Sequence, residues 1–386
     1  MSLPPDNEKQ AIWAERIFDG RLWHDQGAVL IERGRIRGIA APAEIPPDCL
    51  VERVPEGAFV TPGFIDLQVN GGGGVLLNDD PTPAGMRAIA RTHRRFGTTA
   101  LLPTLITDTR EKMLLAIEAA RAVAGDDGIV GLHLEGPFIN RARAGVHARA
   151  QIARASLDDL EWLRGLAQAG RSLITLAPEC VPEGFIRGLV DSGIRIAAGH
   201  SEASAEIVLR AIGEGLTGVT HLFNAMPPFQ GRAPGLVGAA LAESRLVAGL
   251  IVDGHHVDPV SVRAAFRAKG ADRIALVTDA MPTVGAESPE FSLAGRRVVL
   301  GGGRLLTEDG TLAGAHLTMV QAVHNAVTLC GIPLEDALRA ATLSPAQFLG
   351  LENERGALVA GARADLVVLS RDLEVLACWN GGAIGK

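Results

Sequence analysis

From about residue 60 onward, short apolar runs alternate with longer amphipathic stretches. The amphipathic stretches lie at 108–124, 157–169, 182–192, 203–214 and 259–269. The apolar runs are GAFVTPGFIDLQV, TTALLPTL, GIVGLHLEG, SLITLAPE, GIRIAAGHS, GVTHLFNAM, LVAGLIVDGHH and RIALVTDAM. Strands that alternate with helices at this spacing pair in parallel, because each helix returns the chain to the same end of the sheet. Eight runs predict a closed (β/α)₈ barrel, although the pattern is also compatible with an open doubly wound sheet.

Both ends of the chain have a different pattern, with short strands and turns. Residues 11–40 contain strand-like runs around a hairpin turn at Arg33-Gly34, and residues 356–375 have the same character. We therefore predict an α/β protein with a TIM-type (β/α)₈ barrel and a small β-sandwich built from both termini. The predicted limits are residues 1–60 and 351–386 for the sandwich and 61–350 for the barrel.

Two further segments follow the eighth apolar run. Residues 291–312 are β-like and predict a hairpin inserted after the eighth strand. Helical patterns near residues 317–330 and 334–348 predict the helices that complete the barrel.

Composition narrows the classes of partner. The 386 residues carry a net charge of −7 and contain no run of Lys or Arg, which argues against nucleic-acid binding. Aromatic residues make up 4% and tyrosine is absent, so stacking surfaces for bases or long glycans are not expected. No apolar run approaches the roughly 18 residues of a membrane span. Four scattered cysteines without a C-x-x-C motif predict reduced thiols and a cytoplasmic protein.

Polar residues stand at the ends of the predicted strands. The motifs are HLEGP at 133–137, GHS at 199–201, THLFN at 220–224, DGHH at 253–256 and TDA at 278–280. In (β/α)₈ barrels the carboxyl ends of the strands form the active site. A single histidine there is more often a hydrogen-bonded structural residue than a ligand. Five polar ends on one rim instead predict a functional site, because polar groups in such a place need partners.

Two histidines and one carboxylate from these ends match a zinc site. Glu135, His200 and His221 offer two nitrogens and one oxygen and leave a position open for water. Asp279 then lies beside the metal, where it can accept a proton from water that the metal has acidified. Taken alone, Asp279 could equally cap a following helix.

The sequence resembles the amidohydrolase superfamily, and within it most closely the N-acetylglucosamine-6-phosphate deacetylases. The resemblance covers nearly the whole chain. HLEGP and THLFNAM are the specific motifs, whereas PGFID and GARADLVVL are shared widely in the superfamily. The further matching segments are HLEGPFIN followed by GVH, LAPE, AGHSEA, THLFNAMPPFQGRAPGLVG, DGHHVDP, LVTDA and GTLAGAHLTM.

The resemblance implies that the chain hydrolyses N-acetylglucosamine 6-phosphate to glucosamine 6-phosphate and acetate. It implies one divalent metal per subunit on Glu135, His200 and His221, with Zn²⁺ and Fe²⁺ both suited to this ligand set. Asp279 would transfer the proton in both directions, and His147 would help to polarise the acetyl carbonyl.

Strand one differs from that of many amidohydrolases, which carry His-x-His at its end and hold a second metal there. This chain has Gln68 and Asn70 at those positions, and neutral amides are poor zinc ligands. In this respect the sequence resembles the single-metal branch of the deacetylase family. Gln68 and Asn70 would orient ligands or water by hydrogen bonds, or satisfy backbone groups at the barrel mouth. His133, two residues before Glu135, is predicted to support the ligands or to be structural.

The resemblance also implies residues that contact the substrate. Arg232 and His256 would bind the phosphate, and the Arg232 side chain can reach a neighbouring subunit in relatives, which implies a homodimer. The other matched positions bind through the backbone or line the sugar pocket: Val146, His147, Asn224, Ala225, Leu312, Ala313 and Gly314.

Three alternatives remain open at this point. The chain could act on the galactosamine epimer, whose discrimination depends on pocket geometry. It could be another amidohydrolase that opens a cyclic amide, although those usually carry His-x-His and a bridging lysine or cysteine. It could also be a non-catalytic barrel scaffold, but all four metal and catalytic positions are filled.

Overall fold

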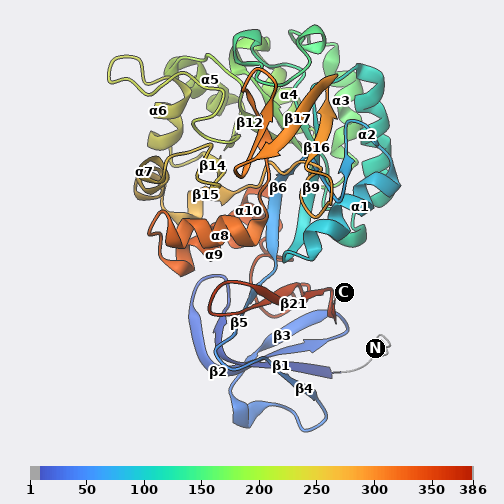
Figure 1. Ribbon diagram of the computed structural model, residues 1–386, viewed down its shortest axis with the longest axis vertical. Coiled ribbons are helices and arrows are strands. Elements are labelled where there is room, and N and C mark those ends of the chain that lie inside the picture. Colours follow the sequence, from blue (N-terminus) through green and yellow to red (C-terminus); the bar gives the residue numbers. More distant parts are fainter. Residues whose placement is uncertain (1–8, 385–386) are drawn as a thin grey trace.

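The computed structural model describes residues 9–384 and contains a barrel and a smaller β structure (Figure 1). Residues 1–8 and 385–386, which belong to the predicted limits of the β-sandwich, lie outside the described residues. Eight parallel strands form one sheet in chain order, and a parallel bridge from Val69 to Ala280 joins the first strand to the end of the last. The strands are β6 (Phe64–Val69), β9 (Thr98–Ile106), β10 (His133–Glu135), β11 (Leu173–Leu176), β12 (Arg195–Ala198), β13 (Gly218–Val219), β14 (Val247–Leu250) and β15 (Ile274–Leu276). The predicted (β/α)₈ barrel is confirmed.

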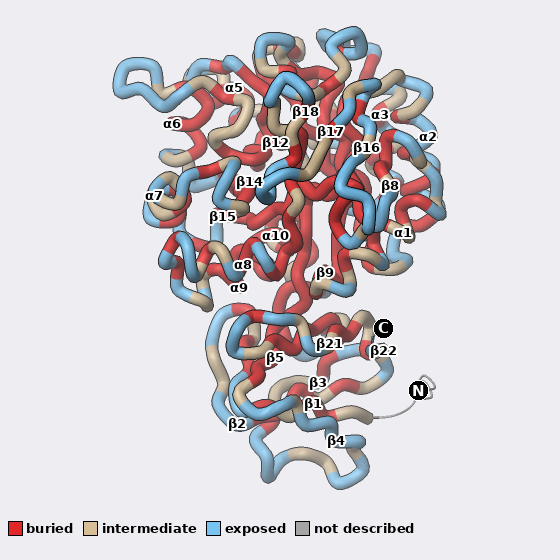
Figure 2. The backbone as a smooth tube through the Cα atoms, in the orientation of Figure 1, coloured by how far each residue is buried: buried red, intermediate tan, exposed pale blue. Residues whose placement is uncertain are grey.

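Helices cover the outside of the barrel, and the strands inside are almost entirely buried (Figures 1 and 2). The five predicted crossover helices are present, and the last predicted helix is broken at Thr342, whose φ of −130° and ψ of −80° interrupt it. None of the helices in the described range is long and apolar enough to cross a membrane. The helices are α1 (Pro83–Arg94), α2 (Arg110–Val123), α3 (Asp159–Ala167), α4 (Phe185–Asp191), α5 (Ala205–Glu214), α6 (Gly235–Ala242), α7 (Pro259–Lys269), α8 (Met319–Thr328), α9 (Leu334–Ala341) and α10 (Leu343–Leu349).

Strands from both ends of the chain pair in a second sheet with its own apolar cluster. The expected turn at Arg33-Gly34 is confirmed: both residues have positive φ, as a two-residue hairpin requires. The apolar run at 57–69 is divided, because β5 pairs with β1 and β20 before β6 enters the barrel. The domain limits stay a prediction. The strands of this sheet are β1 (Lys9–Phe18), β2 (Trp23–Glu32), β3 (Arg35–Ala40), β4 (Leu50–Arg53), β5 (Phe59–Pro62), β20 (Leu366–Leu369), β21 (Val375–Asn380) and β22 (Ala383–Ile384).

A four-stranded antiparallel sheet occupies the segment for which a single hairpin was expected. Its strands are β16 (Glu290–Leu293), β17 (Arg296–Gly301), β18 (Arg304–Thr307) and β19 (Leu312–Ala315). Apolar side chains of this sheet pack on Ile106 and Met281 near the mouth of the barrel. Ala315 bridges to Ala280, which brings β19 beside the end of the last barrel strand. A short hairpin of β7 (Gly71–Gly72) and β8 (Val75–Leu76) follows strand β6.

Asp365 of the GARADLVVL motif forms a buried ion pair, and its backbone contacts the start of the barrel. The Arg355 guanidinium donates to Asp365, and both side chains are buried. The second carboxylate oxygen of Asp365 accepts from Arg363 Nε at 3.1 Å and from the Gly381 N–H at 2.7 Å. The Asp365 carbonyl accepts from the N–H of Gly63, just before β6, at 3.0 Å.

We expect Asp365→Ala to lower the free energy of unfolding by about 3–5 kcal/mol, because it leaves the Arg355 charge buried without its partner. Urea denaturation followed by circular dichroism measures the change. The control is Asp372→Ala, which removes an exposed carboxylate from the same segment and should change stability by about 0.5 kcal/mol or less. Equal losses in the two variants would contradict this role for the ion pair.

Candidate active site

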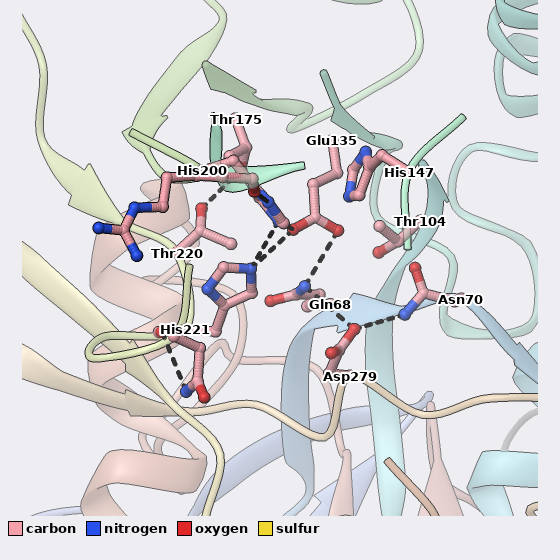
Figure 3. A network of polar contacts seen from close by, with 12 residues as sticks. Gln68, Asn70, Thr104, Glu135, His147, Thr175, His200, Thr220, His221 and Asp279 are labelled. Atoms are coloured by element: carbon pink, nitrogen blue, oxygen red, sulfur yellow. Dashed lines mark hydrogen bonds and ion pairs between the residues drawn. The ribbon is translucent and has the colours of Figure 1, made fainter. Parts of the chain in front are cut away.

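Three side chains from three strand ends direct donor atoms at one point (Figure 3). Glu135 is the last residue of β10, and His200 and His221 follow β12 and β13. The Nε2 atoms of the two histidines lie 3.1 and 3.0 Å from Glu135 Oε1 and 3.0 Å from each other. All three residues are buried. The structure therefore brings the three sequence-predicted ligands together.

The backbone fixes the direction of these side chains. His200 Nδ1 lies 2.7 Å from the carbonyl oxygen of Arg143, which can only accept, so Nδ1 carries the proton and the Nε2 lone pair faces Glu135. His200, His221 and Asp279 all have positive φ, at 49°, 32° and 51°. Non-glycine residues adopt this conformation at an energetic cost that is often found at functional sites.

This arrangement fits a divalent cation. The lone pair of His200 Nε2 faces the carboxylate oxygen Glu135 Oε1 at 3.1 Å, so two electron-rich atoms repel each other there. A cation at the centre removes this conflict. Ligands about 2.0–2.1 Å from one tetrahedral zinc lie roughly 3.3 Å apart, close to the observed spacing. Burial alone would raise the pKa of Glu135, but the adjacent imidazoles of His200 and His221 hold that pKa well below its usual range.

Asp279 lies beside this cluster and is held by the end of strand β6. Its Oδ1 accepts from Asn70 Nδ2 at 2.5 Å and from Gln68 Nε2 at 3.1 Å. Gln68 Nε2 also donates to Glu135 Oε2 at 3.1 Å, so one amide connects the two carboxylates. Burial and the negative charge of Glu135 raise the pKa of Asp279 to about 6.

Asp66, another polar residue of strand β6, holds the residue that precedes Asp279. Asp66 accepts from Thr278 Oγ1 at 2.6 Å and from the Thr278 N–H at 3.3 Å, which fixes the residue just before Asp279. Burial raises the pKa of Asp66 to about 7. The alternating polar residues of β6 thus all hold the end of the eighth barrel strand.

His147 follows a loop after β10 and contacts Thr107. The Thr107 N–H donates to His147 Nδ1 at 3.4 Å, and Thr107 Oγ1 lies 2.8 Å from the same atom. Since Nδ1 accepts, the ring proton is on Nε2, which makes that atom a donor. Burial lowers the pKa of His147 to about 3, so the ring is neutral. No sequence motif pointed to Thr107.

His133 lies deeper in the barrel. Its Nδ1 is 3.0 Å from the Leu67 carbonyl and therefore donates, while Nε2 is 2.8 Å from Thr175 Oγ1. The Thr175 hydroxyl in turn lies 2.5 Å from the Thr220 hydroxyl. The hydrogen bonds thus extend from His133 to Thr220, the residue before His221. Burial lowers the pKa of His133 to about 4. His133 thus supports the strand ends rather than facing the cavity.

A cavity of about 310 Å³ opens at this cluster. It is also lined by Ile106, Ala142, Arg143, Gly145, Ile251, Met281 and Thr311, none of which the sequence analysis singled out. Ala313 is buried behind the wall, and Arg232 is exposed in the loop between β13 and α6 and does not line the cavity. The predicted residues that do line it are Glu135, Val146, His147, His200, His221, Asn224, Ala225, His256, Asp279, Leu312 and Gly314.

His256 enters the cavity from the segment after β14. Its Nδ1 donates to Asp253 Oδ2 at 2.6 Å, and both side chains are largely buried. Burial alone would raise the pKa of Asp253, but the hydrogen bond and charge of His256 lower that pKa to about 2. Asp253 therefore fixes the ring and leaves Nε2 for the cavity.

Comparison with known proteins places this architecture in a family. A model of the amidohydrolase family matches residues 59–383. The chain belongs to the amidohydrolase family. This amidohydrolase is 43% identical over 379 residues to the N-acetylgalactosamine-6-phosphate deacetylase of Shewanella sp. (strain ANA-3), with 95% of each chain covered. It is 38% identical over 347 residues to the N-acetylglucosamine-6-phosphate deacetylase of Bos taurus, with 85% of this chain and 83% of the relative covered.

A solved structure shares the whole fold of this amidohydrolase. The N-acetylglucosamine-6-phosphate deacetylase of Pasteurella multocida matches with a TM-score of 0.94 and 34% identity, covering 97% of this chain and 99% of the other. The family is metal-dependent, and among the described residues one group, Glu135 with His200 and His221, has the spacing of a metal site. The arrangement is therefore suited to metal-assisted hydrolysis of an amide bond.

Proposed function

We propose that this amidohydrolase is a metal-dependent deacetylase that hydrolyses N-acetyl-D-glucosamine 6-phosphate to D-glucosamine 6-phosphate and acetate. The main observation in favour is the convergence of Glu135, His200 and His221 beside the buried carboxylate of Asp279 at the base of a cavity. The names of the relatives supply the substrate class. We further propose Zn²⁺ as the metal, with Fe²⁺ suited to the same ligands, a cytoplasmic location and a homodimer.

The mechanism needs one electrophile, one base and one hydrogen-bond donor. A metal on Glu135, His200 and His221 would supply a Lewis acid that makes water nucleophilic at neutral pH. Asp279 takes a proton from the attacking water on its carboxylate and returns it to the departing amine nitrogen. His147 donates from Nε2 to the acetyl oxygen, on which negative charge develops as water attacks the carbonyl carbon.

Gln68 and Asn70 hold the carboxylate of Asp279, the proposed base, in position. Both amides donate to Asp279 Oδ1, which leaves Oδ2 to accept the proton. Because these residues are engaged with Asp279 and are poor metal ligands, we propose one metal per chain.

The remaining proposed contacts hold the sugar phosphate. His256 and the backbone N–H groups at Asn224 and Ala225 bind the phosphate. Arg232 would contribute from a neighbouring subunit, since it is exposed and does not line the cavity of its own chain. The sugar is bounded by Val146, Leu312, Ala313 and Gly314.

The galactosamine epimer is a second candidate substrate. The observation in its favour is the identity of 43% to the N-acetylgalactosamine-6-phosphate deacetylase of Shewanella, against 38% to the bovine N-acetylglucosamine-6-phosphate deacetylase. The two sugars differ only in the orientation of one hydroxyl group, so a single hydrogen-bonding contact decides between them.

We expect the purified protein to release acetate from N-acetylglucosamine 6-phosphate with kcat/KM more than about 10² times that for N-acetylglucosamine, because the phosphate makes several charge-assisted hydrogen bonds. The assay covers both N-acetylated epimers, each with and without the 6-phosphate. A higher value for the galactosamine phosphate would select the second candidate. Turnover of a cyclic amide alone, or of no substrate with metal bound, would contradict both.

A further inference from the structure

The cavity wall offers little positive charge to a sugar phosphate. Glu135 and Asp279 contribute carboxylates to its wall. Among the residues that the structure describes, Arg143 is the only arginine or lysine in that wall. A phosphate group that enters this cavity needs a cationic partner, and the planar guanidinium matches its oxygens.

Arg143 starts from a fixed backbone. It ends the 3₁₀ helix η3 (Arg141–Arg143), whose N-cap residue is Asn140. The Asn140 side chain accepts from the Ala142 N–H at 2.9 Å, and the Asn140 N–H donates to the His200 carbonyl at 2.8 Å. The Arg143 carbonyl in turn accepts from His200 Nδ1. Both ends of the turn are therefore tied to one metal-site residue.

The loop proposed to bind phosphate through its backbone is tied to the same segment. The Ser201 N–H, next to His200, donates to the Ala225 carbonyl at 3.3 Å. Phe223 and Ala225 have positive φ of 78° and 52°, on either side of Asn224. Alternation of backbone handedness turns successive N–H groups toward one side and favours anions. Arg143 and Ala225 thus both line the cavity, and their carbonyl groups both accept hydrogen bonds from the His200-Ser201 segment.

The guanidinium still has donors to offer. Arg143 Nε donates to Glu202 Oε1, and this is its only side-chain hydrogen bond to any residue in the described part of the chain. The side chain is 31% exposed, and neither of its two terminal amino groups has a hydrogen-bond partner among the described residues. The bond to Glu202 limits the side chain to one region without occupying the terminal fork.

We propose that Arg143 binds the substrate's phosphate from within the same chain, an inference that rests on the proposed function. In this arrangement Arg143 and His256 of one chain form the phosphate site together. Arg232 is then an additional contact from the neighbouring subunit. Arg143 thereby determines the preference for phosphorylated over plain sugars.

The test compares kcat/KM for N-acetylglucosamine 6-phosphate and for N-acetylglucosamine in matched variants. We expect Arg143→Met to lower the value for the phosphorylated sugar on the order of 10- to 100-fold, mainly through KM, and to change the plain sugar little. Arg141→Met removes an exposed charge from the same 3₁₀ helix, outside the cavity wall, and should keep the wild-type ratio. Glu202→Gln should keep the ratio as well, because the guanidinium remains.

Two results would overturn the inference. One is an equal loss for both sugars in Arg143→Met, especially with loss of metal, which would show that the residue only positions His200. The other is an unchanged ratio in Arg143→Met with a collapsed ratio in Arg232→Met. Failure of the proposed function is distinguishable, because the wild-type protein would then hydrolyse none of the sugars. Calorimetric binding of glucosamine 6-phosphate to wild type, Arg143→Met and Arg141→Met would still decide the role of Arg143.

Discussion

Replacing Asp279 with asparagine is expected to lower kcat by about 10⁴-fold, the upper end for general-base catalysis, since one carboxylate serves both proton transfers. Asparagine keeps the shape of the side chain and an oxygen that can accept from Asn70 and Gln68. It removes only the proton acceptor. Because Asp279 is not among the three clustered donors, metal content measured by elemental analysis should stay at the wild-type value.

The control for this variant is Asp66→Asn. It makes the same change in another buried carboxylate at the same end of the barrel, but Asp66 contacts Thr278 and does not line the cavity. We expect its turnover to stay within about tenfold of wild type. Asp279→Asn should also bind intact N-acetylglucosamine 6-phosphate, as measured by calorimetry. Near-normal turnover at full metal occupancy would assign proton transfer to another group, with His147 the first to test.

The metal cluster could be predicted from the sequence because barrel topology restricts where strand ends lie. Glu135, His200 and His221 stand at the ends of β10, β12 and β13, and parallel strands in a barrel end at one rim. Their identity as N and O donors follows from the residue type. The positive φ values of His200 and His221 could not be predicted, since those depend on the tertiary contacts that over-determine the backbone.

The residues that support the cluster were harder to find. Thr107, Thr175 and Thr220 are ordinary strand-forming residues in sequence, and only their positions against His147 and His133 reveal their hydrogen bonds. Arg143 was missed for a related reason. Its place in the cavity wall depends on a loop that is held by His200, a contact between residues far apart in the chain.

The fold shows the same limit. The alternating apolar runs were enough to predict the barrel. The strands of the segment near 291–312 could be predicted only if the number of turns in it were known. Two residue pairs with positive φ, Ala294-Gly295 and Gly302-Gly303, divide it into successive hairpins. Gly-Gly is a recognisable turn signal, but Ala-Gly is a weaker one, which explains why a single hairpin was expected.

Replacing Glu135 with glutamine is expected to remove metal and activity together, with a loss in kcat/KM beyond about 10³-fold. Glu135 is the only anionic member of the cluster, and its Oε1 faces both Nε2 atoms at 3.0–3.1 Å. Glutamine keeps the size but replaces the carboxylate by a neutral amide, a poor ligand for zinc. Elemental analysis should find the variant with little metal after the same purification.

Metal titration of chelated wild-type protein completes this test. Activity should return and saturate near one equivalent of Zn²⁺ per chain, because Gln68 and Asn70 stand where a second set of ligands would be needed. Asp279→Asn provides the contrast: it should bind the same single equivalent without regaining turnover. Two tightly bound metals that are both required would contradict the one-metal site, and full activity of Glu135→Gln without metal would contradict the assignment of the ligand itself.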